Sequence, residues 1–426
     1  EDYYLDEEEP TWLGESIYDD YFTELMNRET ALENQYFSLI AQAGDDFAYT
    51  QSFYDTYGVQ MAQIFVELVQ VRQEQAEYAG FESYPEVAYE FFYARDYSVD
   101  QATSYLADIR AELVPLYQQM LKKQDVVLYN CTESEAFAYV QSLSQTLGGD
   151  IAQAFSAMEK AGVYDITASE NKLDASFEVF IRNYRTPYVF VNSTGTEYDK
   201  LTFAHEFGHF CNDYVSMGSG VSVDLSEIFS QGMEYMSLCH GPADENLKKL
   251  KLLDSLCIYV EQAAYASFEQ QVYALEDDKL TVDGIEALYS QVCENYGITG
   301  GGTYLFITHF FTEPMYVISY VVSNDGAFQI YQMELAEPGK GKTQKQKAAA
   351  AKPSAAALST LLGKHPPLAA AARCQFLKLR QLGFVCAQLQ RAGVPHPHIP
   401  QRKPFHGAGV EKALREAACQ LQPHCP

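Results

Sequence analysis

The chain has 426 residues, of which 47% are hydrophobic, so it can bury a sizeable core, and wholesale disorder is not expected. It carries 58 acidic and 29 basic residues, a formal net charge of −29, which argues against nucleic acid and against an anionic membrane surface as partners. No apolar run reaches the roughly 18 residues that a membrane-spanning helix needs.

The nine cysteines are an odd number without closely spaced pairs. This usage favours reduced thiols and a cytoplasmic location over a disulfide framework. The chain begins at Glu1 and shows no charged-then-apolar signal segment, so we expect a fragment or a chain whose start has been removed. Residues 1–15 are acidic and are expected to fray.

From about residue 18 to 162, apolar residues recur at the spacing of helices. The segment 59–80 stops at a glycine, and the segment 98–124 begins at Ser98, a suitable N-cap. Residues 132–149 begin with the pattern of a capping box and end on paired glycines. These signals predict a series of helices in the first part of the chain.

The periodicity then changes to that of strands. SFEVFI (176–181) and PYVFVN (187–192) are short, rich in β-forming residues and separated by a turn-length segment, so they predict an antiparallel hairpin. From 198 to about 335 the pattern is helical again, with breaks at 217–220 and at the glycine cluster 300–302. The sequence therefore predicts a mainly α protein with a small β-hairpin in front of a second helical series.

Residues 341–426 differ in composition from the rest of the chain. They contain 13 Lys and Arg and two acids, and they contain no Tyr, although the chain has 32. Three interpretations stay open: a basic, disordered tail that folds back on the acidic body, a metal-binding segment, or an out-of-frame translation joined near Gly341, which we favour. We assign no function to this tail and expect one helical domain over 16–340.

The segment LTFAHEFGHF (201–210) carries the pattern His-Glu-x-x-His. On a helix, positions i and i+4 lie on one face, so the imidazoles of His205 and His209 can reach one zinc ion. Glu206 lies beside them and can take a proton from a water that the metal activates. The alternative is an amphipathic helix with two histidines at the edge of the core.

A third ligand is required, and the metzincin pattern is excluded because residue 215 is Val215 rather than histidine. An acidic ligand on a following helix is the other common arrangement. Glu227 and Glu234 lie seven residues apart and share a helix face. We take Glu227 as the ligand and Glu234 as a carboxylate that orients a ligand histidine, with Glu234 as the alternative ligand. Both could also be solvated acids of an acidic chain.

TFAHEFGHF followed by SEIFSQGMEYM resembles the thimet oligopeptidase and oligoendopeptidase F family of zinc metallopeptidases. The segment 168–209 is similar to the lead-in of that family, where a hairpin precedes the zinc helix. The segment 66–86 is similar to a helical segment well before the site, and 308–327 resembles a His-then-Tyr motif near the end. The resemblance covers about residues 40–340, in the order of the family.

The resemblance implies roles for seven residues: His205, His209 and Glu227 as ligands of one zinc ion, Glu206 as general base, and His309, Tyr316 and Tyr320 as groups that bind substrate and stabilise the oxyanion. Tyr316 and Tyr320 are four residues apart, so we expect them to project from one helix face. The family has a further N-terminal region, which we expect to be missing here. The gap from His209 to Glu227 is also a few residues shorter than in the family.

The sequence therefore predicts an oligopeptidase that cuts short unfolded peptides with a metal-activated water. The edge of the hairpin could pair with an extended peptide through main-chain hydrogen bonds. Two alternatives stay open. One is a catalytically weak or inactive relative that binds peptides, and the other is a metal-free structural helical protein whose His-Glu-x-x-His pattern arose by chance.

Overall fold

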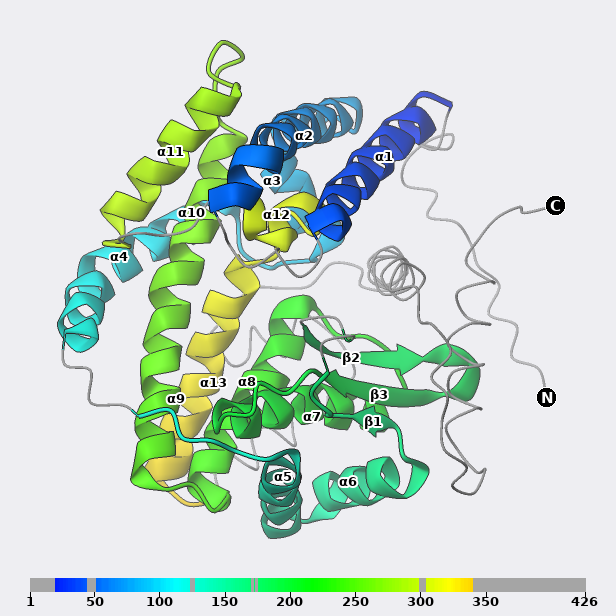
Figure 1. The fold of residues 1–426 in the computed structure, drawn as a ribbon, viewed down its shortest axis with the longest axis vertical. Coiled ribbons are helices and arrows are strands. Elements are labelled where there is room, and N and C mark those ends of the chain that lie inside the picture. The colour runs from blue at the N-terminus through cyan, green and yellow to red at the C-terminus, as the bar shows by residue number, and fades with distance from the viewer. Residues whose placement is uncertain are drawn as a thin grey trace. The chain divides into compact units, whose positions relative to one another are not determined.

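The structure is a computed structural model of the whole chain (Figure 1). It describes residues 20–43, 51–122, 127–169, 172, 175–298 and 304–339. The acidic segment 1–15, the glycine cluster 300–302 and the atypical tail 341–426 lie outside the described residues.

The chain divides into two compact units, one made of residues 1–118 and 260–318, the other of residues 119–259 and 319–426. None of the described helices is long and apolar enough to cross a lipid bilayer. No disulfide joins any of the five described cysteines, Cys131, Cys211, Cys239, Cys257 and Cys293.

The described part of the first unit is helical. Its elements are α1 (Asp20–Ala43), α2 (Gln51–Tyr78), α3 (Tyr84–Val87), the π-helical turn η2 (Ala88–Phe92), α4 (Val99–Leu121), α10 (Ala263–Val272), α11 (Val282–Asn295), the short 3₁₀ turn η5 (Tyr304–Phe306) and α12 (Thr308–Thr312). The predicted segment 59–80 lies largely in α2, which packs along α1. Ser98 caps α4 as predicted, because its Oγ accepts a hydrogen bond from the backbone N–H of Gln101 at 3.2 Å.

An aromatic core holds the first unit together. The ring of Phe65 on α2 lies 5.2 Å from that of Phe311 on α12 and 6.1 Å from that of Phe268 on α10. All three side chains are at most 1% exposed. The short helix α12 is therefore fixed to α2 and α10 by buried rings.

The second unit contains α5 (Glu133–Leu147), α6 (Gly149–Ala161), β1 (Tyr164–Asp165), β2 (Ser176–Ile181), the turn η3 (Arg182–Tyr184), β3 (Thr186–Val191), α7 (Tyr198–Ser216), α8 (Val223–His240), α9 (Glu245–Cys257) and α13 (Ile318–Ala336). A second π-helical turn, η4 (Ile258–Gln262), contains one of the three boundaries between the units, the one at residues 259 and 260. The predicted capping box of α5 is formed, since Thr132 and Glu135 exchange both of its hydrogen bonds.

β2 and β3 form the predicted antiparallel hairpin, and β1 pairs with β3 in parallel, so the strand order is β1-β3-β2. Val189 and Val191 of β3 belong to the same buried cluster as Leu201 and Phe207 of α7. The hairpin precedes α7, the helix with the His-Glu-x-x-His pattern, as the sequence predicted, and it also packs against that helix (Figure 1). The prediction of a mainly α fold with a small sheet is confirmed.

Candidate metal centre

Helix α7 is built to bury one side and to present two histidines on another. Five of its apolar residues are at most 1% exposed and pack in the core: Leu201, Phe203, Ala204, Phe207 and Phe210. The side chains of His205 and His209 keep 21% and 14% of their surface. Their ring centroids lie 5.0 Å apart, as expected for positions one helical turn apart.

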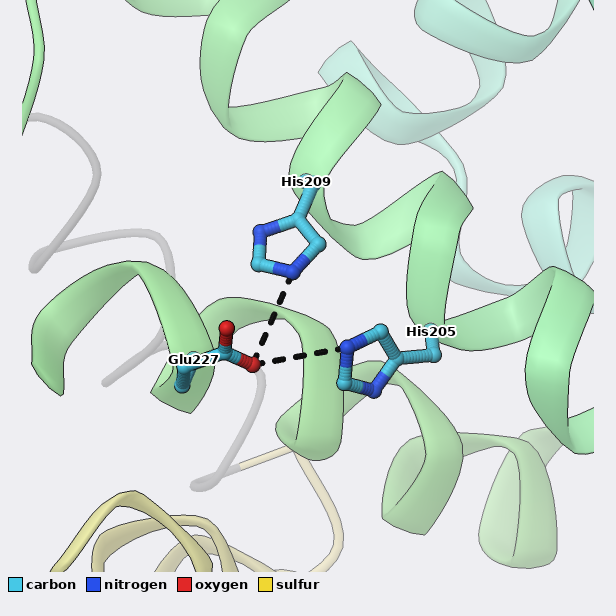
Figure 2. A group of neighbouring side chains, drawn as sticks. All are labelled: His205, His209 and Glu227. Atoms are coloured by element: carbon cyan, nitrogen blue, oxygen red, sulfur yellow. Dashed lines mark ion pairs between the residues drawn. The ribbon is translucent and has the colours of Figure 1, made fainter. Parts of the chain in front are cut away.

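Helix α8 brings a carboxylate to these two rings (Figure 2). Glu227 Oε2 lies 3.4 Å from His205 Nε2 and 3.6 Å from His209 Nε2. Among the described residues, these three form the one group of at least three potential metal ligands whose donor atoms all lie within 4.8 Å of one another. Two donors of a tetrahedral zinc ion, each about 2.1 Å from the metal, are roughly 3.4 Å apart. The three side chains therefore fit such an ion.

The Nδ1 atoms of both histidines are engaged on the side away from Glu227. His205 Nδ1 lies 2.8 Å from Glu234 Oε1, and His209 Nδ1 lies 3.1 Å from Ser226 Oγ. When Nδ1 donates its proton in such a contact, Nε2 carries the lone pair and faces the site. The structure thus places Glu227 at the Nε2 atoms and Glu234 at the opposite side of one ring.

The electrostatic interactions of His205, His209 and Glu227 shift the pKa values of His205 and Glu227. Burial alone would lower the pKa of His205, but its hydrogen bonds with Glu227 and Glu234 outweigh burial and raise the pKa well above the usual range. Burial would likewise raise the pKa of Glu227, but the charge of His209 and the hydrogen bond from His205 hold it well below the usual range. A carboxylate that stays ionised between two imidazoles suits a divalent cation.

Glu206 is 5% exposed and directly follows His205 on α7. Burial raises the pKa of Glu206, although the charges of His205 and His209 act against the shift. A carboxyl group whose pKa is moved towards neutrality can both accept and return a proton.

The local structure around Tyr316 and Tyr320 differs from the one that the sequence predicted. His309 lies on α12, and its ring centroid is 5.1 Å from that of Tyr316, both in the first unit. Tyr320 lies on α13 in the second unit. The expectation that Tyr316 and Tyr320 share one helix face is wrong, because α13 begins only at Ile318.

Tertiary contacts explain why the helix does not start earlier. Met315 has a positive φ of 67°, which is outside the helical range. Its backbone N–H donates to Glu269 Oε1 at 2.7 Å, and its carbonyl accepts from Arg95 Nη2 at 2.8 Å. The carbonyl of Pro314 accepts from Tyr93 Oη at 2.9 Å. Side chains distant in sequence therefore take the backbone groups that a helix would have used.

Another buried charge fixes α12. The guanidinium of Arg72 donates to the carbonyls of Phe310 and Phe311 at 2.8 and 2.5 Å, and its Nε lies 2.8 Å from Glu29 Oε1. Both Arg72 and Glu29 are fully buried. Neither residue could be singled out from the sequence, because nothing in their local sequence distinguishes them from surface charges.

Comparison with known proteins gives matches to solved structures. No protein-family profile matches the chain, and no curated protein matches it. A structure described as an oligoendopeptidase F is 20% identical over 81% of this chain and 76% of its own, with a TM-score of 0.68. Pz peptidase A, solved with an inhibitor, is 18% identical over 88% and 78%, with a TM-score of 0.71. A protein from Bacillus anthracis strain Ames, also described as an oligoendopeptidase F, is 18% identical over 87% and 76%, with a TM-score of 0.65.

The chain has the oligoendopeptidase F fold. The resemblance that the sequence indicated is thereby confirmed at the level of the fold. At 18–20% identity, the likeness to oligoendopeptidase F concerns the fold alone. The chemistry of the site therefore rests on the residues described above.

Proposed function

We propose that the protein is a zinc-dependent endopeptidase that hydrolyses short unfolded peptides, with one zinc ion held by His205, His209 and Glu227. The proposal rests on the convergence of two Nε2 atoms and one carboxylate oxygen at separations that suit a tetrahedral ion. Two imidazoles and one carboxylate form a donor set of catalytic zinc, which leaves a position open for water or substrate. Bound there, zinc would polarise the substrate carbonyl and lower the pKa of a water molecule.

Glu206 is the general base of this proposal. Its carboxylate accepts a proton from the attacking water and returns it to the leaving amine. Its burial supports this role, because the pKa of Glu206 is raised from the usual range. Glu234 orients His205 through Nδ1, and its contact with that atom favours Glu227 over Glu234 as the third ligand.

Substrate contacts come from three further parts of the chain. Within the described residues, β2 is an edge strand with β3 as its one neighbour, so an extended peptide can pair with it through main-chain hydrogen bonds. Such pairing makes side-chain selectivity broad. We assign His309, Tyr316 and Tyr320 to substrate binding and oxyanion stabilisation, since imidazolium and phenol groups can donate to a developing negative charge. We also propose that the protein is cytoplasmic.

The experiment is cleavage of an internally quenched fluorescent peptide by the parent chain and by Glu206→Gln. We expect kcat to fall by about 10²-fold or more in the variant, with bound zinc unchanged, because the amide cannot accept the proton. Glu245→Gln is the matched control, since the Glu245 side chain is 83% exposed on α9, and its kcat should stay at the parent level.

The other outcomes decide between the alternatives. Equal cleavage by the zinc-loaded parent and Glu206→Gln would contradict the assigned base. A parent chain that binds zinc and peptide but never cleaves would indicate a peptide-binding relative. A parent chain that takes up no zinc would indicate a structural helical protein.

A further inference from the structure

Lys251 is a fully buried cation close to the proposed metal site. It lies on α9, and its exposed fraction is 0%. Lysines are almost never fully buried unless they are paired, because the ammonium group loses its hydration. The same helix carries Lys248, whose side chain is 35% exposed and contacts Glu245 at the surface. The burial of Lys251 therefore calls for buried partners.

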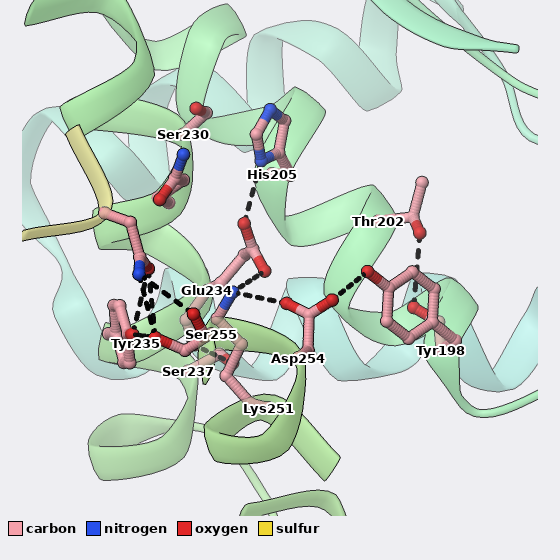
Figure 3. Close-up of polar contacts among 12 residues, drawn as sticks. Tyr198, Thr202, His205, Ser230, Glu234, Tyr235, Ser237, Lys251, Asp254 and Ser255 are labelled. Atoms are coloured by element: carbon pink, nitrogen blue, oxygen red, sulfur yellow. Dashed lines mark hydrogen bonds and ion pairs between the residues drawn. The ribbon is translucent and has the colours of Figure 1, made fainter. Parts of the chain in front are cut away.

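Two carboxylates supply them (Figure 3). Lys251 Nζ lies 2.7 Å from Glu234 Oε2 and 2.9 Å from Asp254 Oδ2. It also lies 5.1 Å from the centre of the Tyr235 ring. Asp254 in turn accepts a hydrogen bond from Tyr198 Oη at 2.6 Å.

The contacts make a closed path through three helices. The path leaves α7 at His205 and reaches Glu234 on α8 through Nδ1. It continues to Lys251 and Asp254 on α9 and returns to α7 at Tyr198. Both oxygens of Glu234 are thus committed, Oε1 to His205 and Oε2 to Lys251. Because the carboxylate is rigid and planar, the contact of Oε2 with Lys251 fixes the direction in which Oε1 points towards His205.

We propose that Lys251 is a positioning residue for the metal site: by holding Glu234 Oε2 it keeps Oε1 on His205 Nδ1, and it thereby strengthens the binding of a divalent cation by His205, His209 and Glu227. This role rests on the metal site of the proposed function. Without Lys251, the buried carboxylate of Glu234 loses its counter-ion and is no longer aimed at the imidazole. Residues that support metal ligands typically contribute 10–100-fold to metal affinity.

If the charge of Lys251 acted only by repulsion, its removal would change zinc affinity in the opposite direction. Removal of a cation near the site would strengthen the binding of Zn²⁺ if electrostatic repulsion by Lys251 were its main effect. A positioning role instead predicts weaker binding. The sign of the change in zinc affinity therefore separates the two.

The test is competition for Zn²⁺ between a chromophoric chelator and the full-length chain. Lys251→Met keeps the length of the side chain and removes the charge, and we expect its zinc Kd to rise about 10–100-fold. Lys248→Met is the matched control on the same helix and should bind as the parent does. The d–d absorption of the Co²⁺-loaded variant should also change, which a loss of global stability in a folded protein would not cause.

A second variant covers the case in which Lys251→Met does not fold. Lys251→Gln keeps a donor for Glu234, so it should fold more readily and show a smaller increase in Kd. A folded variant of either kind that binds zinc as tightly as the parent, or more tightly, would overturn the role of Lys251.

If neither variant folds, the zinc affinity of the double variant Lys251→Met/Glu234→Gln, in which both charges are removed, is compared with that of Glu234→Gln. The proposal predicts equal zinc affinity for these two, because Lys251 acts through Glu234. A weaker affinity of the double variant would overturn that route. A parent chain that binds no zinc would overturn the proposed function as well, whereas a zinc-binding parent with an unaffected Lys251→Met would overturn this inference alone.

Discussion

Gly208 of α7 and Ser230 of α8 lie where the two helices touch backbone to backbone. A Cβ atom at position 208 would lie 2.6 Å from Ser230 Cα and 2.6 Å from the carbonyl oxygen of Phe229. Gly208 directly precedes His209, and Ser230 lies about one turn after Glu227. The spacing of the proposed ligands on the two helices therefore depends on the absence of a side chain at position 208.

Replacement of Gly208 by Ala should push α7 and α8 apart. We expect the free energy of unfolding to fall by about 1–3 kcal/mol and zinc affinity to fall with it, since the added methyl group meets backbone atoms that cannot turn away. Gly232→Ala is the control, because no atom lies within 4 Å of a Cβ built there and alanine favours the helix by about 0.5–1 kcal/mol. Urea unfolding followed by circular dichroism gives the free energy of unfolding of both variants, and competition with a chelator gives their zinc affinities. Parent-like zinc binding by Gly208→Ala would contradict the argument.

The two histidines should depend unequally on their outer partners. His205 is held by a carboxylate at 2.8 Å, whereas His209 is held by a hydroxyl group at 3.1 Å. A hydrogen bond to a charged acceptor is stronger than one to a neutral acceptor. We therefore expect Glu234→Gln to weaken zinc binding about 10–100-fold and Ser226→Ala by less. Chelator competition gives both affinities, and a larger loss in Ser226→Ala would contradict this order.

Loss of the Arg72 charge should destabilise the first unit. Arg72→Met leaves Glu29 buried without its cation and frees the carbonyls of Phe310 and Phe311, so we expect a loss of about 3–5 kcal/mol in the free energy of unfolding. Arg28→Met is the control: Arg28 pairs with Glu74 at 2.9 Å, but both side chains are more than one-third exposed. Its loss should stay below about 1 kcal/mol. Equal effects of the two substitutions in urea unfolding would refute the buried role of Arg72.

Glu269 should make stability depend on pH. Burial raises the pKa of Glu269 to about 8, while the N–H of Met315 and the charges of Arg95 and Arg72 act to lower it. The folded chain thus keeps this carboxyl protonated where the unfolded chain ionises it. Its contribution to stability is complete below about pH 4.5 and is lost as the pH rises to 8, with a slope of at most about 1.4 kcal/mol per pH unit.

Glu269→Gln should flatten that slope. Its side-chain oxygen can still accept from Met315 N–H, but the amide does not titrate. Urea midpoints of the parent chain and the variant at pH 5 and pH 8 give the comparison. The same pH dependence in both proteins would show that Glu269 is not the group responsible.

The sequence predicted the features that depend on neighbours within a few residues. Three such features are each encoded by a short segment, and the structure contains all of them: the capping box at Thr132, the hairpin of 176–181 and 187–192, and the one-turn spacing of His205 and His209. The resemblance to oligoendopeptidase F drew on several such segments in order. This is why the fold could be predicted at 18–20% identity to solved structures.

Features that depend on distant partners could not be predicted in this way. Strand β1 has two residues and exists only because it pairs with β3. Lys248 and Lys251 lie close together in the sequence, yet Lys251 is a buried cation that contacts Glu234 on another helix, whereas Lys248 contacts Glu245 at the surface. Met315 leaves the helical range because Glu269 and Arg95 bind its backbone. A periodic pattern contains no information about such partners.

The most direct test of the account is the zinc content of the purified chain, measured by elemental analysis beside His205→Ala and Glu227→Ala. We predict about one zinc ion per chain in the parent and none in either variant, because a site of three protein ligands does not survive the loss of one. Zinc retained in Glu227→Ala would contradict the assigned third ligand. A parent chain without zinc, even after zinc is added, would contradict the metal centre itself.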